Sequence, residues 1–303
     1  MTTQRQLTCL LVNLFTCQLV YLSTVSFFSL FWDVEYKFYA KIQISSEKTV
    51  ILHFNFIIMS CILSIDTSTE VCSVALSEDG MCIFHKEDFD GHKHAENIGP
   101  FVDEAMSFAD SHAIPLDAVA VSSGPGSYTG LRIGVSMAKG ICYALDLKLI
   151  AIPTLQLLAV PVLLQMEMED DALLCPMIDA RRMEVYAAVY DRGLRELRPI
   201  QADVVDAETY KPWLDDHPVY FFGNGASKCK DILTHPNAHF LEGKKPLAKY
   251  MFPLAEKRIA MEQFEDVAYF TPFYLKDYVA KKAKNKILES LKETSKQVDK
   301  LTS

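Results

Sequence analysis

Apolar residues change their spacing along the first half of the chain, and each spacing predicts a different element. Runs that are apolar throughout, or that alternate with polar residues, predict β-strands. These runs lie at residues 62–65, 71–76, 81–84, 118–121 and 149–152. Apolar residues that recur every three or four positions predict helices with one buried face. Such helices are expected at residues 94–112, 129–145 and 153–168.

The same pattern begins again near residue 173. Asp66 follows the first strand of the first unit, and Asp179 ends a strand-like run that starts at residue 173. A turn, a second strand and an acidic turn follow each Asp, so the chain carries an internal repeat. Later elements are expected as a strand at 219–222 and helices at 227–233 and 253–262. Two such units predict two α/β lobes with mixed sheets flanked by helices.

The two ends of the chain differ from this repeat. Residues 7–32 are largely apolar and uncharged, which is long enough to cross a bilayer as a membrane anchor. The alternative is that Met1 lies upstream of the true translation start, which would be Met59. We favour this alternative because a well-patterned domain opens at Met59. The sequence thus predicts an extension at 1–58, an N-terminal lobe at 59–167, a C-terminal lobe at 168–280 and a charged tail at 281–303.

Composition narrows the classes of function. The net charge of −9 argues against a protein that binds nucleic acid unaided, because phosphates are bound by clustered Lys and Arg. A role beside a basic partner stays open. The eight cysteines form no C-x-x-C pair, so we expect reduced thiols in the cytoplasm rather than a disulfide or zinc framework.

A glycine-rich segment at residues 122–134 joins the strand at 118–121 to the next helix. Its four glycines and one proline are typical of a loop with a defined shape. The glycine spacing matches neither the G-x-x-x-x-G-K-[ST] phosphate loop nor the G-x-G-x-x-G dinucleotide fingerprint. We therefore predict a shaped turn that begins a helix and carries no catalytic residue.

Five segments resemble the bacterial TsaB (YeaZ) family. They lie at residues 62–69, 94–100, 123–134, 177–186 and 272–276. The likeness covers roughly residues 59–280, and the run from Gly124 to Gly134 is its most specific part. Membership implies the two-lobed actin/Hsp70-like ATPase (ASKHA) fold, which agrees with the internal repeat.

The resemblance also implies a function in making threonylcarbamoyladenosine next to the anticodon of tRNAs. In that system TsaC makes threonylcarbamoyl-AMP, and TsaD transfers the threonylcarbamoyl group to adenosine. TsaB is the non-catalytic partner that binds and activates TsaD, and the ATPase TsaE joins them. The implied partners are TsaD in a heterodimer, TsaE in a ternary complex and tRNA indirectly, with a homodimer as the alternative for the free protein. ATP and Mg²⁺ are expected only at the level of the complex.

Metal and catalytic residues are not predicted. In the resembling system, the catalytic protein TsaD holds its metal through two histidines spaced H-x-x-x-H. In this chain His92 and His94 are two positions apart, and on a helix they would lie on different faces. In an extended segment the two would share a side, but no third ligand stands at metal-site spacing. No Ser–His–Asp or Cys–His arrangement can be assembled from the spacing either. The alternative function, a nucleotide-hydrolysing or peptidase enzyme of the same fold, is disfavoured for these reasons.

Four residues occupy positions that hold nucleotide in related folds: Asp66, Thr67, Asp179 and Gly223. The turns after the two Asp residues contain no glycine, which hinders a close approach of backbone to phosphate. We therefore favour structural turns in which the Asp side chains bind backbone N–H groups. A plain turn is likewise favoured at Gly223.

The helices at 94–112 and 129–145 form the predicted partner interface. They carry more small and apolar residues than one buried stripe needs, and the resemblance implies that they pair with their equivalents in TsaD. The predicted contact residues are Ala95, Ile98, Phe101, Val102, Ala105, Arg132, Val135 and Ala138. The alternative is that both helices simply pack on their own sheet.

Overall fold

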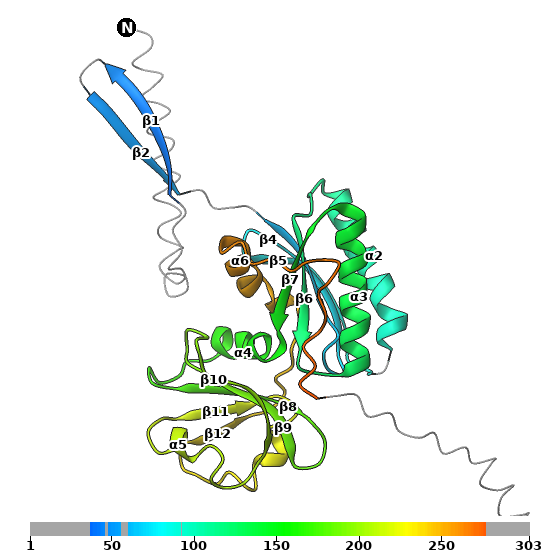
Figure 1. The fold of residues 1–303 in the computed structure, drawn as a ribbon, viewed down its shortest axis with the longest axis vertical. Coiled ribbons are helices and arrows are strands. Elements are labelled where there is room, and N and C mark those ends of the chain that lie inside the picture. Colours follow the sequence, from blue (N-terminus) through cyan, green and yellow to red (C-terminus); the bar gives the residue numbers. More distant parts are fainter. Residues whose placement is uncertain (1–36, 46–47, 56–59, 92, 277–303) are drawn as a thin grey trace, which may run out of the picture.

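Two five-stranded mixed sheets divide the chain into the two lobes that the repeat predicts (Figure 1). The structure is a computed structural model that describes residues 37–45, 48–55, 60–91 and 93–276. The strand order is β5-β4-β3-β6-β7 in the N-terminal lobe and β10-β9-β8-β11-β12 in the C-terminal lobe. In each lobe the first strand is central, pairing antiparallel with the second and parallel with the fourth. The shared topology confirms the predicted two-lobed actin/Hsp70-like fold.

The strands of the N-terminal lobe confirm the predicted ones within a few residues. They are β3 (Cys61–Asp66), β4 (Cys72–Glu78), β5 (Met81–Asp88), β6 (Ala118–Gly124) and β7 (Lys148–Pro153). Alternate residues of β3 face opposite sides, as the pleat requires. Leu63 and Ile65 belong to the core under the outer helices, whereas Ile62 belongs to the core between the lobes.

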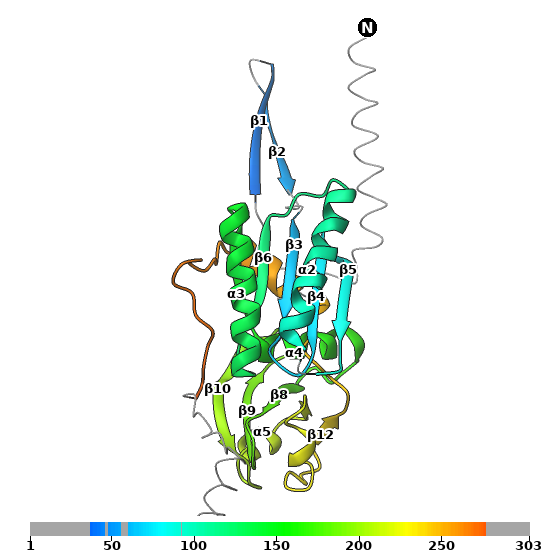
Figure 2. The same cartoon turned by 90° about the vertical axis from the view of Figure 1, so that its right-hand side faces the viewer.

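Helices α2 (His94–Ser111) and α3 (Tyr128–Leu145) cover the outer face of this sheet and lie side by side (Figure 2). Each presents one buried stripe to the sheet, as its periodicity predicts. Val102 of α2 and Val135 of α3 pack with Val119 of β6 in one apolar cluster. The opposite stripes of both helices face away from the sheet.

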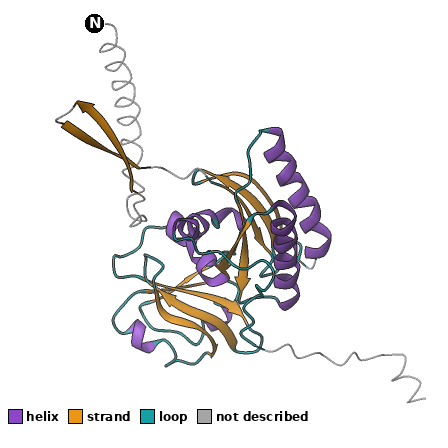
Figure 3. Ribbon diagram, turned by 45° about the horizontal axis from the view of Figure 1, so that its top comes forward, coloured by secondary structure: helices purple, strands orange, loops and turns teal. Residues whose placement is uncertain are grey.

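Helices α4 (Thr154–Gln165) and α6 (Phe252–Ala260) lie between the two sheets (Figure 3). Both sheets contribute to the core around α4, so its apolar residues are buried on every side, from Leu155 to Val162. A helix that is apolar all round fits only such a position. Pro161 lies inside α4, and the helix stops at Gln165 rather than at the predicted residue 168.

The C-terminal lobe departs further from the predictions. Its strands are β8 (Leu173–Asp179), β9 (Glu184–Tyr190), β10 (Glu196–Val204), β11 (Val219–Phe222) and β12 (Ala238–Leu241). Two of them, β10 and β12, were not predicted. The helix expected at 227–233 is only a 3₁₀ turn, η1 (Ser227–Cys229), and the other short helical pieces are α5 (Lys211–Leu214) and η2 (Ala248–Tyr250).

The extension contributes an antiparallel pair, β1 (Lys37–Ser45) and β2 (Lys48–Asn55). The apolar run at 7–32 and the charged tail at 281–303 lie outside the described residues. Among the helices of the described part, none combines the length and apolarity needed to cross a membrane.

Within the edge strand β10, the half-buried Arg198 pairs with the buried Asp203. Arg198 donates from both terminal nitrogens to the two carboxylate oxygens of Asp203, at 2.7 and 2.6 Å. Tyr210 Oη donates to Asp203 Oδ2 at 2.6 Å, and the Arg198 guanidinium lies 5.5 Å from the centre of the Tyr210 ring. Both carboxylate oxygens are thus engaged, which is the condition under which a buried carboxylate is tolerated.

We expect Asp203→Asn to lower the free energy of unfolding by about 2 kcal/mol, because it removes the charged partner of the half-buried Arg198 guanidinium. Urea unfolding measures this loss. The matched control is Glu208→Gln, which breaks the exposed Lys211–Glu208 pair and should cost less than about 0.5 kcal/mol. Equal losses in the two variants would contradict a structural role for the Asp203 network.

Candidate functional site

The glycine-rich loop packs α3 against the turn that follows β3. Cβ atoms at Gly130 and Gly134 would clash with Thr67, and one at Gly126 would clash with the Ser68 carbonyl. Thr67 Oγ1 donates to the Gly130 carbonyl at 2.7 Å, and Ser127 N donates to the Ser68 carbonyl at 2.7 Å. Protein backbone therefore fills the space beside the loop, and the glycines are required for this close approach.

Asp66 lies at the end of β3 inside this contact and is fully buried. Its Oδ1 accepts hydrogen bonds from Ser68 N at 3.3 Å and Ser68 Oγ at 2.7 Å, which is the structural turn favoured from the sequence. Oδ2 has no well-formed hydrogen bond within the described residues. Burial raises the pKa of Asp66 to about 6, although the hydroxyls of Ser122 and Ser68 and the nearby His94 oppose the rise.

Of the two histidines weighed as metal ligands, His94 lies in the described part of the chain. His94 is buried at the start of α2, and its Nε2 donates to the Thr69 carbonyl at 2.8 Å. His92 lies outside the described residues. His94 thus ties the start of α2 to the turn after β3.

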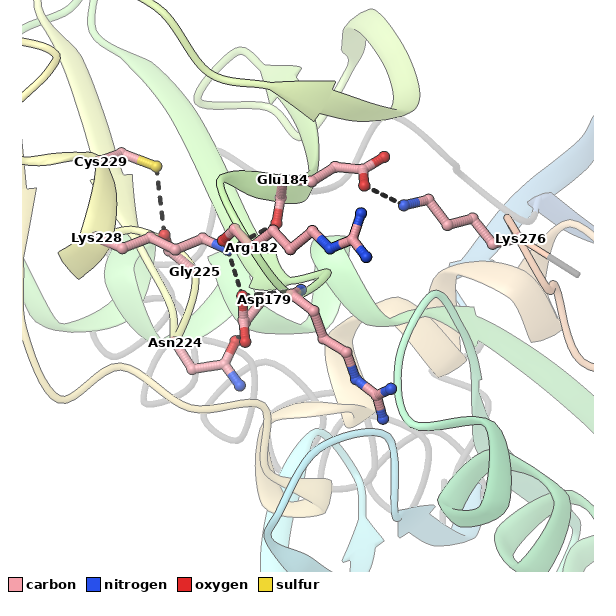
Figure 4. Close-up of polar contacts among 9 residues, drawn as sticks. Asp179, Arg182, Glu184, Asn224, Gly225, Lys228, Cys229 and Lys276 are labelled. Atoms are coloured by element: carbon pink, nitrogen blue, oxygen red, sulfur yellow. Dashed lines mark hydrogen bonds and ion pairs between the residues drawn. The ribbon is translucent and has the colours of Figure 1, made fainter. Parts of the chain in front are cut away.

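Asp179 forms the corresponding turn in the C-terminal lobe (Figure 4). Its Oδ1 accepts a hydrogen bond from Arg181 N at 3.1 Å and pairs with the Lys228 ammonium. Its backbone N donates to Asn224 Oδ1 at 3.0 Å. A Cβ at Gly223, where φ is +99°, would clash with the Met177 carbonyl. Both positions thus serve tight turns in this structure.

The gap between the lobes is narrow at these turns. Asn224 Nδ2 donates to Glu70 Oε2 at 3.3 Å, and Lys245 pairs with the other oxygen of Glu70 at 3.4 Å. The cavity that remains beside Glu70 and Asn224 is about 10 Å³, whereas pockets for small ligands hold roughly 300–1,000 Å³. The cavity beside these side chains is thus far smaller than an ordinary small-ligand pocket.

A groove of about 1000 Å³ lies on the outer face, between α2 and α3. The residues that line it are Ala95, Ile98 and Met106 of α2, with Tyr128, Thr129, Arg132, Ile133, Ser136, Met137, Gly140, Ile141, Ala144 and Leu145 of α3. The lining is mostly apolar or small. Arg132 is the charged residue of the wall, and its guanidinium lies 5.6 Å from the centre of the Tyr128 ring.

Small residues follow the exposed edge of this groove at every fourth position of α3: Ser136, Gly140 and Ala144. Gly140 lies in the helix interior, where glycine is less stable than alanine by about 1 kcal/mol. A Cβ there would touch nothing within 4 Å, so packing inside the described chain does not require this glycine. A second surface that approaches α3 closely would require it.

The predicted interface residues fall into two groups. Five are buried against their own sheet, which matches the alternative that the helices pack on that sheet: Ile98, Val102, Ala105, Val135 and Ala138. Ala95 and Arg132 are exposed at the groove, and Phe101 is half-buried. Sequence reasoning missed Ser136 and Gly140 in the row from Ser136 to Ala144, although the spacing of its small residues was a usable signal.

Comparisons with known proteins find relatives that are named for threonylcarbamoyladenosine biosynthesis. A family model described as TsaD, tRNA N6-adenosine threonylcarbamoyltransferase, matches residues 89–284. The chain is 32% identical to the "tRNA threonylcarbamoyladenosine biosynthesis protein TsaB" of Bacillus subtilis, over 57% of this chain and 74% of that protein. It is 29% identical to the Escherichia coli protein of the same name, over 72% of this chain and 96% of that protein.

A solved structure has the same fold. The structure titled "YeaZ from Pseudomonas aeruginosa" is similar with a TM-score of 0.61 and 27% identity. The match covers 72% of this chain and the whole of that chain. The architecture of this chain therefore agrees with that of its relatives across both lobes.

Asp66 should make stability depend on pH. The folded protein raises the pKa of Asp66 from 3.8 to about 6, so protonated Asp66 stabilises the fold, and this contribution is lost as pH rises through about 6. An asparagine at this position would stay neutral, so we expect the stability of Asp66→Asn relative to the parent to rise by on the order of 3 kcal/mol between about pH 4 and pH 7. Urea unfolding over a pH series measures it.

Asp110→Asn is the control for this series, since it removes an exposed carboxylate from α2 and the same charge. The difference in unfolding free energy between Asp110→Asn and the parent should change far less between about pH 4 and pH 7. If the difference in unfolding free energy between Asp66→Asn and the parent stayed constant with pH, ionisation of the buried Asp66 carboxyl would not destabilise the fold.

Proposed function

Because this chain belongs to the TsaB family, we propose that it takes part in the biosynthesis of threonylcarbamoyladenosine in tRNA as a non-catalytic subunit. It binds a TsaD-type subunit through the groove between α2 and α3, and this contact stabilises the active form of that subunit. The observation that carries the proposal is the groove itself, with its exposed row of small residues.

The groove has the chemistry of a helix-docking surface. Its wall is apolar, and the row of Ser136, Gly140 and Ala144 allows another helix to approach the α3 backbone closely. Tyr143, which is 86% exposed, and Leu145, which is 47% exposed, lie at the C-terminal end of the same helix. Apolar side chains of this size are exposed to water unless a partner covers them, and their burial would favour a stable complex.

The matching family model supports a partner of related fold. Residues 89–284 match the model that describes TsaD, so a TsaD-type subunit is expected to present helices equivalent to α2 and α3. The two equivalent surfaces can pair around a pseudo-two-fold axis, so that the groove of each subunit receives a helix of the other. A homodimer of this chain would use the same surface, so homodimer and heterodimer are expected to exclude each other.

The lobes support a non-catalytic role. Asp66 is engaged with Ser68, Asp179 is paired with Lys228, and the gap beside Glu70 and Asn224 holds about 10 Å³. The chain thus contributes a surface, while transfer chemistry belongs to the TsaD-type subunit. A ternary complex with TsaE, ATP with Mg²⁺ at the level of that complex and a cytoplasmic location stay predictions.

Ser136→Arg should break the complex. Ser136 is exposed in the groove wall, so an arginine there leaves the core intact but fills the space that the partner helix needs. We expect affinity for the TsaD-type subunit to fall at least about tenfold, measured by co-purification and by calorimetric titration. Charged residues at Ile98 or Val135 would be uninformative, because each is only 3% exposed and the lobe would unfold.

The matched control is Ser107→Arg, which makes the same change at an exposed position of α2 outside the groove. It should bind the TsaD-type subunit like the parent. If both folded variants bind with parental affinity, the groove is not the interface and the proposed contact is wrong.

A further inference from the structure

The turn between β8 and β9 holds two arginines in an unfavourable backbone conformation. Arg181 has φ of +70° and Arg182 has φ of +53°. The hairpin closes around them, with Ala180 N donating to the Glu184 carbonyl at 3.0 Å. Two consecutive left-handed residues favour Asn-Gly, because side chains with a Cβ are disfavoured there. The chain instead places two long cationic side chains at this position.

Surrounding groups hold the turn in this conformation (Figure 4). The Lys228 ammonium lies beside it and donates to the Arg182 and Glu184 carbonyls, both at 2.7 Å. It also pairs with the Asp179 carboxylate, which in turn accepts a hydrogen bond from Arg181 N. An unfavourable backbone conformation that is fixed so firmly by its neighbours is typical of functional positions.

The charge of both arginines is uncompensated within the described residues. Asp179 and Glu184 flank the turn, but Asp179 is already paired with Lys228 and Glu184 with Lys276. Neither guanidinium forms an ion pair or hydrogen bond with another described residue, and both side chains are exposed. In Figure 4 the Arg182 side chain extends from the turn toward the side of Lys276.

Tyr186 lies on the same hairpin as the two arginines. The Lys276 ammonium is 5.8 Å from the centre of the Tyr186 ring, which is half-buried on β9. Burial raises the pKa of Tyr186 and the charge of Glu184 adds to the rise, while the charges of Lys276 and Arg181 oppose it. Exposed arginines and a tyrosine on one hairpin supply the phosphate-binding and stacking groups that RNA-binding surfaces combine.

We propose that the Arg181–Arg182 turn, with Tyr186 on the same hairpin, binds the phosphate backbone of RNA. Planar guanidinium groups bind phosphate oxygens in pairs, and both are available here. The inference rests on the proposed function, in which the complex acts on tRNA. Since the chain carries a net charge of −9, the turn adds to the RNA surface of the complex rather than binding RNA alone.

The test uses the full chain in complex with the TsaD-type subunit. In the double variant Arg181→Asn, Arg182→Gly the turn receives the residues that its backbone favours, so the melting temperature should stay equal or rise. Binding of fluorescently labelled tRNA, followed by anisotropy over a salt series, should weaken about tenfold or more. The slope of log affinity against log salt should fall by about 2, one for each lost phosphate contact.

The control is Arg195→Asn, which removes another exposed arginine of the same lobe, one already paired with Asp191. It should leave tRNA affinity and the salt slope unchanged. Parental affinity and slope in the double variant, with the complex intact, would overturn the inference and leave the proposed function standing. The inference would also be overturned if the double variant no longer bound the TsaD-type subunit but the tRNA affinity of the separate proteins did not change. The turn would then bind an acidic segment of the partner rather than RNA. Failure of the parent chain to bind the TsaD-type subunit would overturn both.

Discussion

The close approach of α3 to the turn after β3 is the contact on which the rest of the N-terminal lobe depends. Gly126, Gly130 and Gly134 remove the side chains that would otherwise keep the two backbones apart, and Thr67 fills the space with its own hydrogen bond. This contact sets the position of α3 on the sheet, and α3 supplies most of the groove wall. The glycine-rich loop is thus a packing device, and its effect on function is exerted through the helix that it positions.

The two lobes repeat one topology but not one surface. In the N-terminal lobe the connections around β6 are the long helices α2 and α3, whereas the corresponding connections around β11 carry only α5 and η1. Among the described residues, a groove between long helices therefore forms on the first lobe. The C-terminal lobe presents instead the strained turn after β8. The surface for a protein partner and the surface for a charged ligand thus come from different copies of the same unit.

The sequence was sufficient to predict an element where its local apolar pattern agrees with its burial in the fold. Strands such as β3 and helices such as α2 were predicted because apolar spacing is strong there, and the repeat of Asp66 and Asp179 predicted two lobes. It failed for β10, whose residues are half-exposed and whose register shifts near Arg198, and for the four-residue strand β12. It also could not separate Val135, which is buried, from Ser136, which faces the groove, because tertiary packing decides which stripe of a helix meets the sheet.

The central claim is that this chain supports threonylcarbamoyladenosine formation through the outer face of α3. The most direct measurement is the content of that nucleoside in bulk tRNA of cells that lack the gene and receive either the parent chain or Gly140→Leu. Leucine favours the helix more than glycine does, and its side chain meets open space within the described chain, so this variant should fold. We expect deletion to deplete the nucleoside, the parent to restore it and Gly140→Leu to fail. Normal nucleoside content without the gene, or full restoration by Gly140→Leu, would contradict the account.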